Sequence, residues 1–435
     1  ALKKIVARDE GASKITGKKA LEGAAVALEH RMREAEIGTM LSGYGIGGAV
    51  QNKITQKYGA GTQDMLTRRP YELITDIKGI AFGTADKIAL SAGFAKDSPE
   101  RIRAAIIEAL RLASTNGHTA LYHHGLVSSI EDMIYVSSDK IEEQIKNLSG
   151  KAIQEHEIRG NRTWSLTRLD DAEERVARNI INKLAQAPRH TREEAEQAVD
   201  AAISRSSGTL NERQREAAIV AISSPLSILT GGPGTGKTHT LRIILEAWKA
   251  LCAQKRLNLP VQIAAPTGKA AKRASEVTGI DGKTIHRALE YDPESNSFQR
   301  NRGNPIDAGF LAIDESSMPD ILITRDLTEA WGDSSVLLVG DVEQIPSVGP
   351  GCVLRDLLES GVVPATRLIE IYRQSEGSEV ALGADDVRLG RMPQTAAPGK
   401  GELVFIDINS PAEVAERIRE MYVEKMPRYL ASKDM

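Results

Sequence analysis

The sequence has few cysteines and no long hydrophobic run. Its two cysteines among 435 residues, Cys252 and Cys352, lie far apart and have no CxxC or CxxH neighbour, which argues against a disulfide framework, a zinc site or an iron–sulfur cluster. No apolar segment approaches the roughly 18 residues of a membrane span, and the first residues contain no signal-peptide core. We therefore expect a cytoplasmic protein with no membrane contact.

The charge balance is nearly even. The chain has 56 basic and 59 acidic residues, a formal net charge of −3, so no overall excess of charge indicates a nucleic-acid partner. Phosphate binding depends on where lysine and arginine lie, and such a function has to be argued from local clusters. The length predicts about two to four domains.

The feature that organises the chain is a glycine-rich turn at residues 231–236. An apolar strand precedes the turn and an amphipathic helix follows it directly, which is the context that a phosphate-binding loop requires. The glycines permit backbone conformations that a Cβ forbids, so successive N–H groups and the positive end of the helix can face one anion. The candidate nucleotide ligands in and after this turn are Gly232, Pro233, Gly234, Thr235, Gly236, Lys237, Thr238 and His239.

Four side chains suit the cleavage of a nucleoside triphosphate. Lys237 can reach the β- and γ-phosphates, and the hydroxyl of Thr238 can ligate the bridging Mg²⁺. A buried strand over residues 310–313 ends in Asp314, which can hold Mg²⁺ through its water shell, and Glu315, which can accept a proton from the attacking water. We therefore expect ATP and Mg²⁺ as cofactors and Lys237 and Glu315 as catalytic residues.

Three further side chains complete the candidate site. Gln214 heads the helix before the glycine turn, and its amide has the donor and the acceptor that are needed to read adenine. Gln344 follows a strand at residues 336–340 and can report the presence of the γ-phosphate to the attached loop. Arg373 can stabilise charge that develops during phosphoryl transfer, and a surface salt bridge is the alternative.

Two strand ends carry groups that can bind the phosphates of a single nucleic-acid strand. Each delivers a hydroxyl, backbone N–H groups and positive charge into a new helix, and a solvated basic helix is the alternative. Between residues 288 and 302, two short runs joined across Pro293 predict a small β-hairpin. The candidate strand contacts are Pro266, Thr267, Gly268, Lys269, Thr284, His286 and Arg287.

The first 95 residues contain a helix, a glycine turn and a second helix twice. These look like paired helix-hairpin-helix units whose turns expose backbone N–H groups to a nucleic-acid phosphate, with Gly45, Gly47 and Lys53 as candidate contacts. The second turn has Ala81 in place of its second glycine, which puts its phosphate contact in doubt. A helical spacer without a ligand is the alternative. Further basic residues near the turns are Lys57, Arg68, Arg69 and Lys87.

Residues 96–190 mix helices and strands. His118, His123 and His124 have no carboxylate or cysteine at ligand spacing, so we interpret them as structural or surface residues. A domain boundary is predicted at residues 188–191. Hydrophobic periodicity predicts helices over residues 99–113, 138–148 and 170–185, and a hairpin of strands over residues 152–158 and 162–166.

The ordered set of motifs resembles superfamily 1 DNA helicases of the RecD-like type, and the N-terminal region resembles that of the stand-alone members. The resemblance implies a RecA-like α/β ATPase domain, with a parallel sheet flanked by helices, behind an all-helical helix-hairpin-helix region. It implies ATP-driven 5′-to-3′ movement on single-stranded DNA in repair or recombination, with the hairpin near residues 288–302 as the pin that splits the duplex. We expect a monomer that binds single strands and single-strand/duplex junctions.

The resemblance also sets the expected domains: 1–95, 96–190, 191–365, and 366–435 as the start of a second RecA-like domain. That last domain contains one predicted strand, 403–407, and one predicted helix, 412–421. We therefore expect the sequence to be part of a longer protein, and this chain alone to hydrolyse ATP and translocate poorly. Two alternatives stay open: a DNA-stimulated ATPase that remodels protein–DNA complexes without unwinding, and an ATP-switched, structure-specific DNA-binding module.

Overall fold

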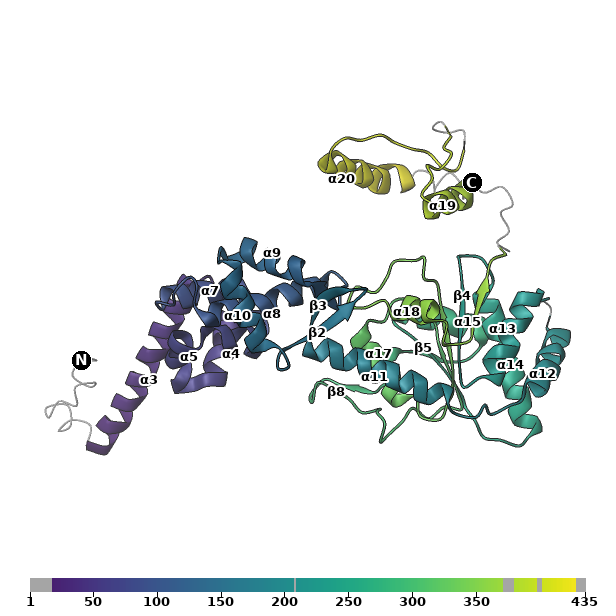
Figure 1. Cartoon of the computed structure of the whole chain (residues 1–435), viewed down its shortest axis with the longest axis horizontal. Coiled ribbons are helices and arrows are strands. Elements are labelled where there is room, and N and C mark those ends of the chain that lie inside the picture. The colour runs from purple at the N-terminus through teal and green to yellow at the C-terminus, as the bar shows by residue number, and fades with distance from the viewer. Residues whose placement is uncertain (1–17, 207–208, 371–378, 397–400, 428–435) are drawn as a thin grey trace. The chain divides into compact units, whose positions relative to one another are not determined.

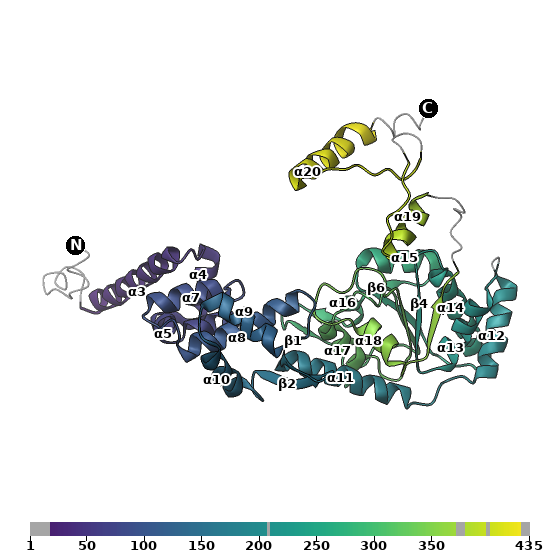
Figure 2. The same ribbon diagram turned by 45° about the horizontal axis from the view of Figure 1, so that its top comes forward.

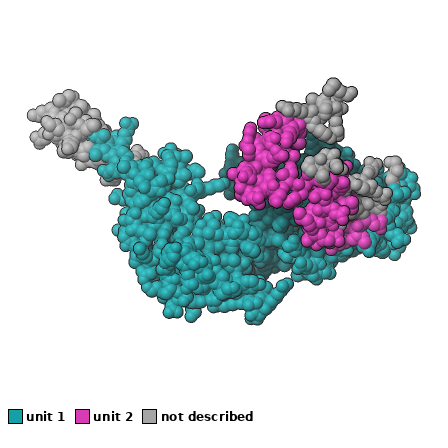
Figure 3. Space-filling view, turned by 90° about the horizontal axis from the view of Figure 1, so that it is seen from above, with its two compact units in different colours: residues 1–229, 238–366 teal, residues 230–237, 367–435 magenta. Residues whose placement is uncertain are grey.

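The structure of the chain is a computed structural model that describes residues 18–206, 209–370, 379–396 and 401–427 (Figure 1). Its internal packing divides the chain into two units, one made of residues 1–229 and 238–366 and the other of residues 230–237 and 367–435 (Figure 3). Among the described residues, no helix combines the length and the apolar character that crossing a bilayer requires.

A six-stranded sheet organises the region that contains the predicted ATPase motifs. Its strand order is β11-β4-β10-β9-β5-β6, and the pairs β5–β6, β5–β9 and β9–β10 are parallel. The central strands β4, β9 and β10 are almost entirely buried, as expected for a sheet that is covered on both faces. The strands are β4 (Leu226–Gly231), β5 (Val261–Ala265), β6 (Gly282–Thr284), β9 (Phe310–Ile313), β10 (Ser335–Gly340) and β11 (Ala365–Leu368).

Helices cover both faces of this sheet. Helices α17 and α18 lie on one side of the strands and α13 and α14 on the other (Figures 1 and 2). The ring of the buried Trp248, on α14, lies 4.9 Å from that of Phe310 on β9. The arrangement confirms the predicted RecA-like α/β fold. The helices are α13 (Glu212–Ser223), α14 (Lys237–Gln254), α15 (Gly268–Thr278), α16 (Ile285–Ala288), α17 (Ile321–Ala330) and α18 (Val353–Ser360).

A small antiparallel hairpin is inserted after α16. Its strands β7 (Tyr291–Asp292) and β8 (Ser297–Phe298) pair Tyr291 with Phe298 and Asp292 with Ser297. The hairpin predicted between residues 288 and 302 is therefore confirmed.

The connecting region contains helices around a three-stranded antiparallel sheet of order β1-β3-β2. The helix predicted at residues 138–148 and the hairpin of β2 and β3 are confirmed, whereas β1 and α9 were not predicted. His123 accepts a hydrogen bond from Trp164 Nε1 at 2.9 Å and lies 2.5 Å from a carboxylate oxygen of Glu142, which supports its interpretation as a structural residue. The elements are α8 (Pro99–Thr115), β1 (Ala120–Tyr122), α9 (His123–Ile134), α10 (Ser138–Leu148), β2 (Ile153–Ile158), β3 (Asn161–Leu166) and α11 (Thr167–Leu184).

Helix α11 joins the connecting region to the sheet by packing along α17. The buried Lys183 donates from Nζ to the carbonyl oxygens of Gly332 at 2.7 Å and Ser334 at 2.8 Å. The predicted boundary at residues 188–191 is the start of another helix, α12 (Arg192–Arg205). The side chain of Thr191 and that of Glu194 form a capping box there, which was not recognised in the sequence.

The N-terminal helices share a core of their own, to which Leu41, Ile54, Leu66 and Ile88 contribute fully buried side chains. Asp86 ties this core to α8. Its carboxylate accepts from Arg101 Nε at 2.8 Å, Arg101 Nη2 at 2.9 Å and the Tyr71 hydroxyl at 2.7 Å. The helices are α3 (Lys18–Gly43), α4 (Gly48–Tyr58), α5 (Thr62–Arg68), α6 (Leu73–Asp76) and α7 (Phe82–Ser91), with short 3-10 turns at Gly59–Gly61 and Pro70–Glu72.

The smaller unit contains α19 (Glu379–Arg388), α20 (Pro411–Glu420) and a π-helical turn (Met421–Lys425). The helix predicted at 412–421 is confirmed as α20, whose N-cap Ser410 accepts from the N–H of Glu413 at 3.2 Å. The strand predicted at 403–407 is wrong, because no strand forms there. A strand needs a hydrogen-bonded neighbour, and the described part of this unit outside β4 and β11 supplies none.

Candidate active site

The glycine-rich loop follows β4 and leads into α14. Gly234 and Gly236 have φ angles of 80° and 85°, in the left-handed region that other residues rarely enter. Gly231 is needed for a different reason: a Cβ there would lie 2.7 Å from the carbonyl oxygen of Leu368 and 2.8 Å from Thr235 Oγ1. Gly234 and Gly236 are thus required for their backbone conformation, and Gly231 is required because a Cβ would not fit.

The first residue of α14 is the candidate catalytic lysine. Lys237 Nζ donates to the carbonyl oxygens of Gly231 at 2.6 Å and Gly232 at 3.1 Å, and Thr235 Oγ1 donates to Gly232 at 2.9 Å. These bonds hold an ammonium group over the loop, at the positive end of an 18-residue helix. This local arrangement suits an anion that carries several negative charges.

The candidate acidic pair follows β9, and both neighbouring strands fix its backbone. The N–H of Asp314 donates to Ala264 on β5 at 2.9 Å, and the N–H of Ser316 donates to Val339 on β10 at 2.8 Å. Asp314 Oδ1 accepts from the N–H of Glu315 at 3.0 Å. These bonds set the position of the two carboxylates at the carboxyl end of the strand.

Glu315 has a strained backbone. Its φ of 53° lies in the left-handed region, which costs a residue with a Cβ about 1–3 kcal/mol. Such strain persists where the surrounding structure imposes it, and it concentrates at functional sites. Five other described non-glycine residues also have a positive φ, so this strain agrees with a functional role for Glu315 but does not identify it alone.

The loop after β10 carries Gln344 and is organised by a residue that the sequence analysis missed. Asp341 is 2% exposed, and its carboxylate accepts from the N–H of Glu343 at 3.1 Å and from Gln344 Nε2 at 3.2 Å. An aspartate directly after a buried strand, with a turn following, is the signal that could have identified it. Gln344 is itself exposed, on a turn that Asp341 fixes.

Of the other two candidates for the nucleotide site, the structure describes Gln214 but not Arg373. Gln214 is buried and takes part in a capping box: its Oε1 accepts from the N–H of Asn211 at 3.1 Å, and Asn211 Oδ1 accepts from the N–H of Gln214 at 2.7 Å. The contact of Gln214 with adenine remains a prediction. Arg373 lies outside the described residues.

The candidate strand contacts come from two adjacent parallel strands. Ala265 of β5 pairs with Thr284 of β6, so the segments that follow these strands begin side by side. Thr267 caps α15 by accepting from the N–H of Ala270 at 3.2 Å, and Thr284 caps α16 by accepting from the N–H of Arg287 at 3.2 Å. Lys269, His286 and Arg287 are exposed at this edge, together with Gly268.

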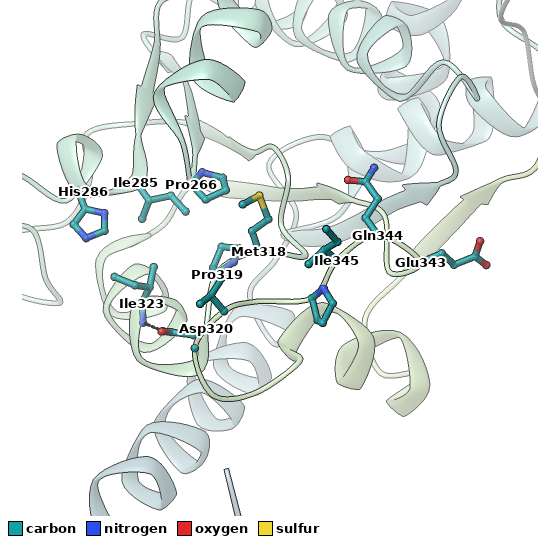
Figure 4. A pocket seen from close by; sticks show the side chains of 13 residues that line it. Pro266, Ile285, His286, Met318, Pro319, Asp320, Ile323, Glu343, Gln344 and Ile345 are labelled. Carbon is teal, nitrogen blue, oxygen red and sulfur yellow. Dashed lines mark hydrogen bonds between the residues drawn. The ribbon is translucent and has the colours of Figure 1, made fainter. Parts of the chain in front are cut away.

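A pocket of about 660 Å³ brings together three residues that were predicted from separate motifs, namely Pro266, His286 and Gln344. Figure 4 shows His286 and Gln344 at opposite ends of the pocket, with Met318 and Pro319 between them. The Gln344 loop adds exposed apolar side chains to its wall: Ile345 is 84% exposed and Val348 is 85% exposed. Polar groups at the ends and an apolar middle suit a ligand with both phosphates and flat bases.

The two N-terminal glycine turns have the same backbone. Their first glycines, Gly45 and Gly79, have φ angles of 77° and 114°. Their last residues, Gly47 and Ala81, are extended N-caps, with φ and ψ of −72° and 155° and of −93° and 163°. Any residue can adopt that conformation, so alanine in the second turn does not disturb its shape.

Acidic partners neutralise several of the basic residues near these turns. Lys57 Nζ lies 3.1 Å from a carboxylate oxygen of Asp76, and Arg68 lies 3.1 Å from Asp64. Lys53, by contrast, is exposed on α4. Lys87 is likewise exposed, on α7. A phosphate contact in this region would therefore rely on backbone N–H groups, Lys53 and Lys87 more than on Lys57 and Arg68.

Two models of protein families match segments of this chain. Residues 30–120 match the helix-hairpin-helix domain of the ATP-dependent RecD2 DNA helicases, and residues 214–350 match an AAA domain. The ATP-dependent RecD2 DNA helicase of Deinococcus radiodurans is 31% identical over 365 residues, which cover 81% of this chain and 49% of that protein. The RecBCD enzyme subunit RecD of Mycolicibacterium smegmatis is 38% identical over 176 residues, covering 36% of this chain and 32% of that protein.

A crystal structure of Pif1 helicase from Candida albicans aligns with 49% of this chain and 55% of that chain, at 21% identity and a TM-score of 0.32. The chain spans about half the length, or less, of the curated relatives that it matches. Both segment matches and the identity across most of the chain agree with the motif order and with the geometry of the glycine loop. Over the segments that these comparisons cover, the chain is therefore similar to RecD-like superfamily 1 DNA helicases.

Proposed function

We propose that the protein is an ATP-dependent helicase that moves 5′ to 3′ along single-stranded DNA and unwinds duplexes in repair or recombination. One observation carries the proposal: Lys237 folds over the glycine loop that follows β4, an acidic pair with a strained glutamate follows β9, and both strands belong to one sheet. A loop of this kind binds phosphates, and a positioned carboxylate is needed for hydrolysis. The likeness to a DNA helicase over most of the chain supports DNA as the polymer along which the protein moves.

In this proposal, Lys237 and the N–H groups of the loop bind the β- and γ-phosphates of ATP. Glu315 accepts a proton from the attacking water, and Gln344 responds to the γ-phosphate. Gln214 contacts adenine, and Arg373 stabilises the charge of the transition state.

The Thr238 hydroxyl and the Asp314 carboxylate would hold Mg²⁺. Both are hard oxygen donors of the kind that this ion prefers, and it usually takes few protein ligands because phosphates and water complete its shell. The part of the chain that the structure describes contains no cluster of three or more histidine, cysteine or acidic side chains for a metal, which fits an ion shared with the nucleotide. When bound, the ion offsets negative charge on the phosphates.

The DNA strand would cross the edge formed by the ends of β5 and β6. The hydroxyls and N–H groups of the Thr267 and Thr284 caps, with Lys269 and Arg287, offer phosphate contacts at that edge. The pocket that contains Pro266 and Gln344 would lie along the strand and connect its position to the nucleotide-responsive loop. The N-terminal turns at Gly45 and Gly47, with Lys53, would contact duplex or junction phosphates.

Strand displacement tests this proposal. The full-length gene product, with ATP and Mg²⁺, should separate a duplex that carries a 5′ single-stranded overhang and should fail on one with a 3′ overhang or blunt ends. Displacement from the 3′ overhang alone would overturn the polarity. DNA-stimulated hydrolysis without displacement on any substrate would favour the remodelling ATPase over the helicase.

A further inference from the structure

The inserted hairpin is short and is braced at both ends. At its tip, the Tyr291 hydroxyl donates to Asn296 Oδ1 at 2.7 Å, and Asp292 accepts from the N–H of Glu294 at 2.9 Å. At its base, Arg300 Nη2 lies 2.8 Å from a carboxylate oxygen of Glu290. Each strand has only two paired residues, and an isolated two-stranded hairpin is marginally stable in water. The hairpin therefore needs support from outside its own ladder.

That support comes from an aromatic cluster. The rings of Tyr291 and Phe298 pack across the strands with their centroids 5.4 Å apart. The imidazole of His286 lies 5.6 Å from the Phe298 ring and 6.0 Å from the Tyr291 ring, both in edge-on arrangements. Such arrangements are the favoured geometry of aromatic pairs. His286 thus contacts both aromatic residues of the hairpin.

His286 stands on a fixed base. Its helix, α16, buries Ile285 and Ala288 in the core of the domain, and Leu289, the next residue, is fully buried. The imidazole also lines the pocket whose far end contains Gln344 (Figure 4). One side chain therefore lies both at the predicted DNA edge and against the hairpin.

We propose that His286 is a positioning residue that holds the hairpin against α16 at the end of the strand path. The proposal rests on the helicase function proposed above and goes beyond it, because it assigns the ring a role through Phe298 and Tyr291. If the hairpin is held loosely, ATP turnover no longer translates fully into strand separation. The measured quantity is therefore the number of base pairs separated per ATP hydrolysed.

The test compares His286→Ala with His286→Phe in the full-length gene product. His286→Ala should lower the base pairs separated per ATP by about fivefold or more, and His286→Phe, which restores a flat ring, should recover the ratio to within about twofold. His124→Ala is the matched control, because His124 is also exposed and stacked on an aromatic ring, that of Tyr122, in the connecting region. It should leave the ratio unchanged.

A combination with Phe298→Leu identifies the partner of His286. Because both residues act through one contact, the double variant His286→Ala/Phe298→Leu should be no worse than the poorer single variant. An unchanged ratio in His286→Ala overturns the proposal. So does a His286→Phe variant that behaves like His286→Ala, since the imidazole would then act on DNA directly.

The melting temperature of each variant separates loss of support for the hairpin from loss of the whole fold. His286→Phe keeps the test decisive if the alanine variant unfolds. A wild-type protein that hydrolyses ATP on DNA but separates no duplex would instead overturn the proposed helicase function, and this inference with it.

Discussion

Two kinds of glycine turn precede helices in this chain, and they differ in how many positions require glycine. The loop after β4 has three: Gly234 and Gly236 through their positive φ angles, and Gly231 through close packing. Each N-terminal turn has one, Gly45 or Gly79. A glycine pattern predicts a specific turn more strongly when more of its positions exclude other residues, either through a positive φ angle or because a Cβ would not fit. The loop therefore predicts a phosphate site from its sequence alone, whereas the paired turns need the match to a family model to be interpreted.

The comparison also explains the alanine in the second N-terminal turn. Gly47 and Ala81 occupy the same extended N-cap conformation, which is open to any residue. Ala81 in place of glycine is therefore compatible with a phosphate contact at the second turn.

A large effect is expected beyond the loop itself, at the strained carboxylate. Glu315→Gln keeps the size of the side chain but replaces one carboxylate oxygen with an NH2 donor and removes its ability to accept a proton, so the rate of ATP hydrolysis should fall by about 10²–10⁴-fold. ATP should still bind, because the loop is unchanged. Steady-state hydrolysis and equilibrium nucleotide binding measure the two effects. Glu329→Gln, which loses only an ion pair with Arg175, is the control. A Glu315→Gln enzyme with near-normal turnover would remove this residue from the chemistry.

Neighbouring glycines in the loop should differ sharply. Gly231→Ala places a Cβ 2.7 Å from a carbonyl oxygen, so it must distort the loop and should weaken nucleotide binding by about tenfold or more. Gly232→Ala changes the same loop without this clash, because no protein atom lies within 4 Å of its Cβ position, so it should lose less affinity than Gly231→Ala. Titration with a fluorescent ATP analogue measures both affinities. Equal affinities for the two variants would show that close packing at Gly231 has no functional weight.

The end of the Gln344 loop offers a comparison between two glycines with positive φ. Gly351 has φ of 94°, donates its N–H to Gly117 at 3.0 Å, and has Ile321 3.2 Å from its Cβ position; Gly361 has φ of 65° and open space. Gly361→Ala should cost about 1 kcal/mol of unfolding free energy from backbone strain alone, and Gly351→Ala should cost more. Urea unfolding measures the difference. A smaller loss for Gly351→Ala would contradict the crowding inferred at this site.

The smallest effects are expected in the N-terminal turns. Gly45→Ala should lower the unfolding free energy by about 1 kcal/mol, because its φ is 77°, whereas Gly47→Ala should change it by less than about 0.5 kcal/mol. Both variants can be compared by urea unfolding and by duplex-DNA binding. A Gly47→Ala protein that folds normally but loses DNA affinity would mean that close approach of DNA, and not backbone conformation, selects glycine there.

Much of the fold follows from periodicity and turn chemistry. Helices α8, α10 and α11, the hairpin of β2 and β3, and the strands that carry the candidate site could be predicted because their apolar spacing is regular. Helix α9 was not predicted because it begins with two polar residues, His123 and His124, which were considered only as possible metal ligands. Helix α12 was missed because its Thr191 cap was interpreted as part of a boundary. The strand at 403–407 was wrong, because an apolar run becomes a strand only where another strand can pair with it.

The candidate site was predictable where chemistry depends on local spacing, and less so where it depends on packing. The glycine loop and the Asp314-Glu315 pair needed only their sequence context. The left-handed backbone of Glu315 and the packing of His286 on the hairpin depend on contacts between strands and loops. No single-sequence pattern encodes those contacts.

The rate of ATP hydrolysis with and without single-stranded DNA shows whether the glycine loop belongs to a DNA-driven ATPase. The full-length gene product should turn over at least about tenfold faster on DNA, as expected when a strand completes the active arrangement. Lys237→Ala should abolish turnover, and Lys249→Ala, an exposed lysine on the same helix, should preserve it. An ATP hydrolysis rate that does not rise with DNA, or that is unchanged in Lys237→Ala, would show that the glycine loop is not the site of a DNA-driven ATPase.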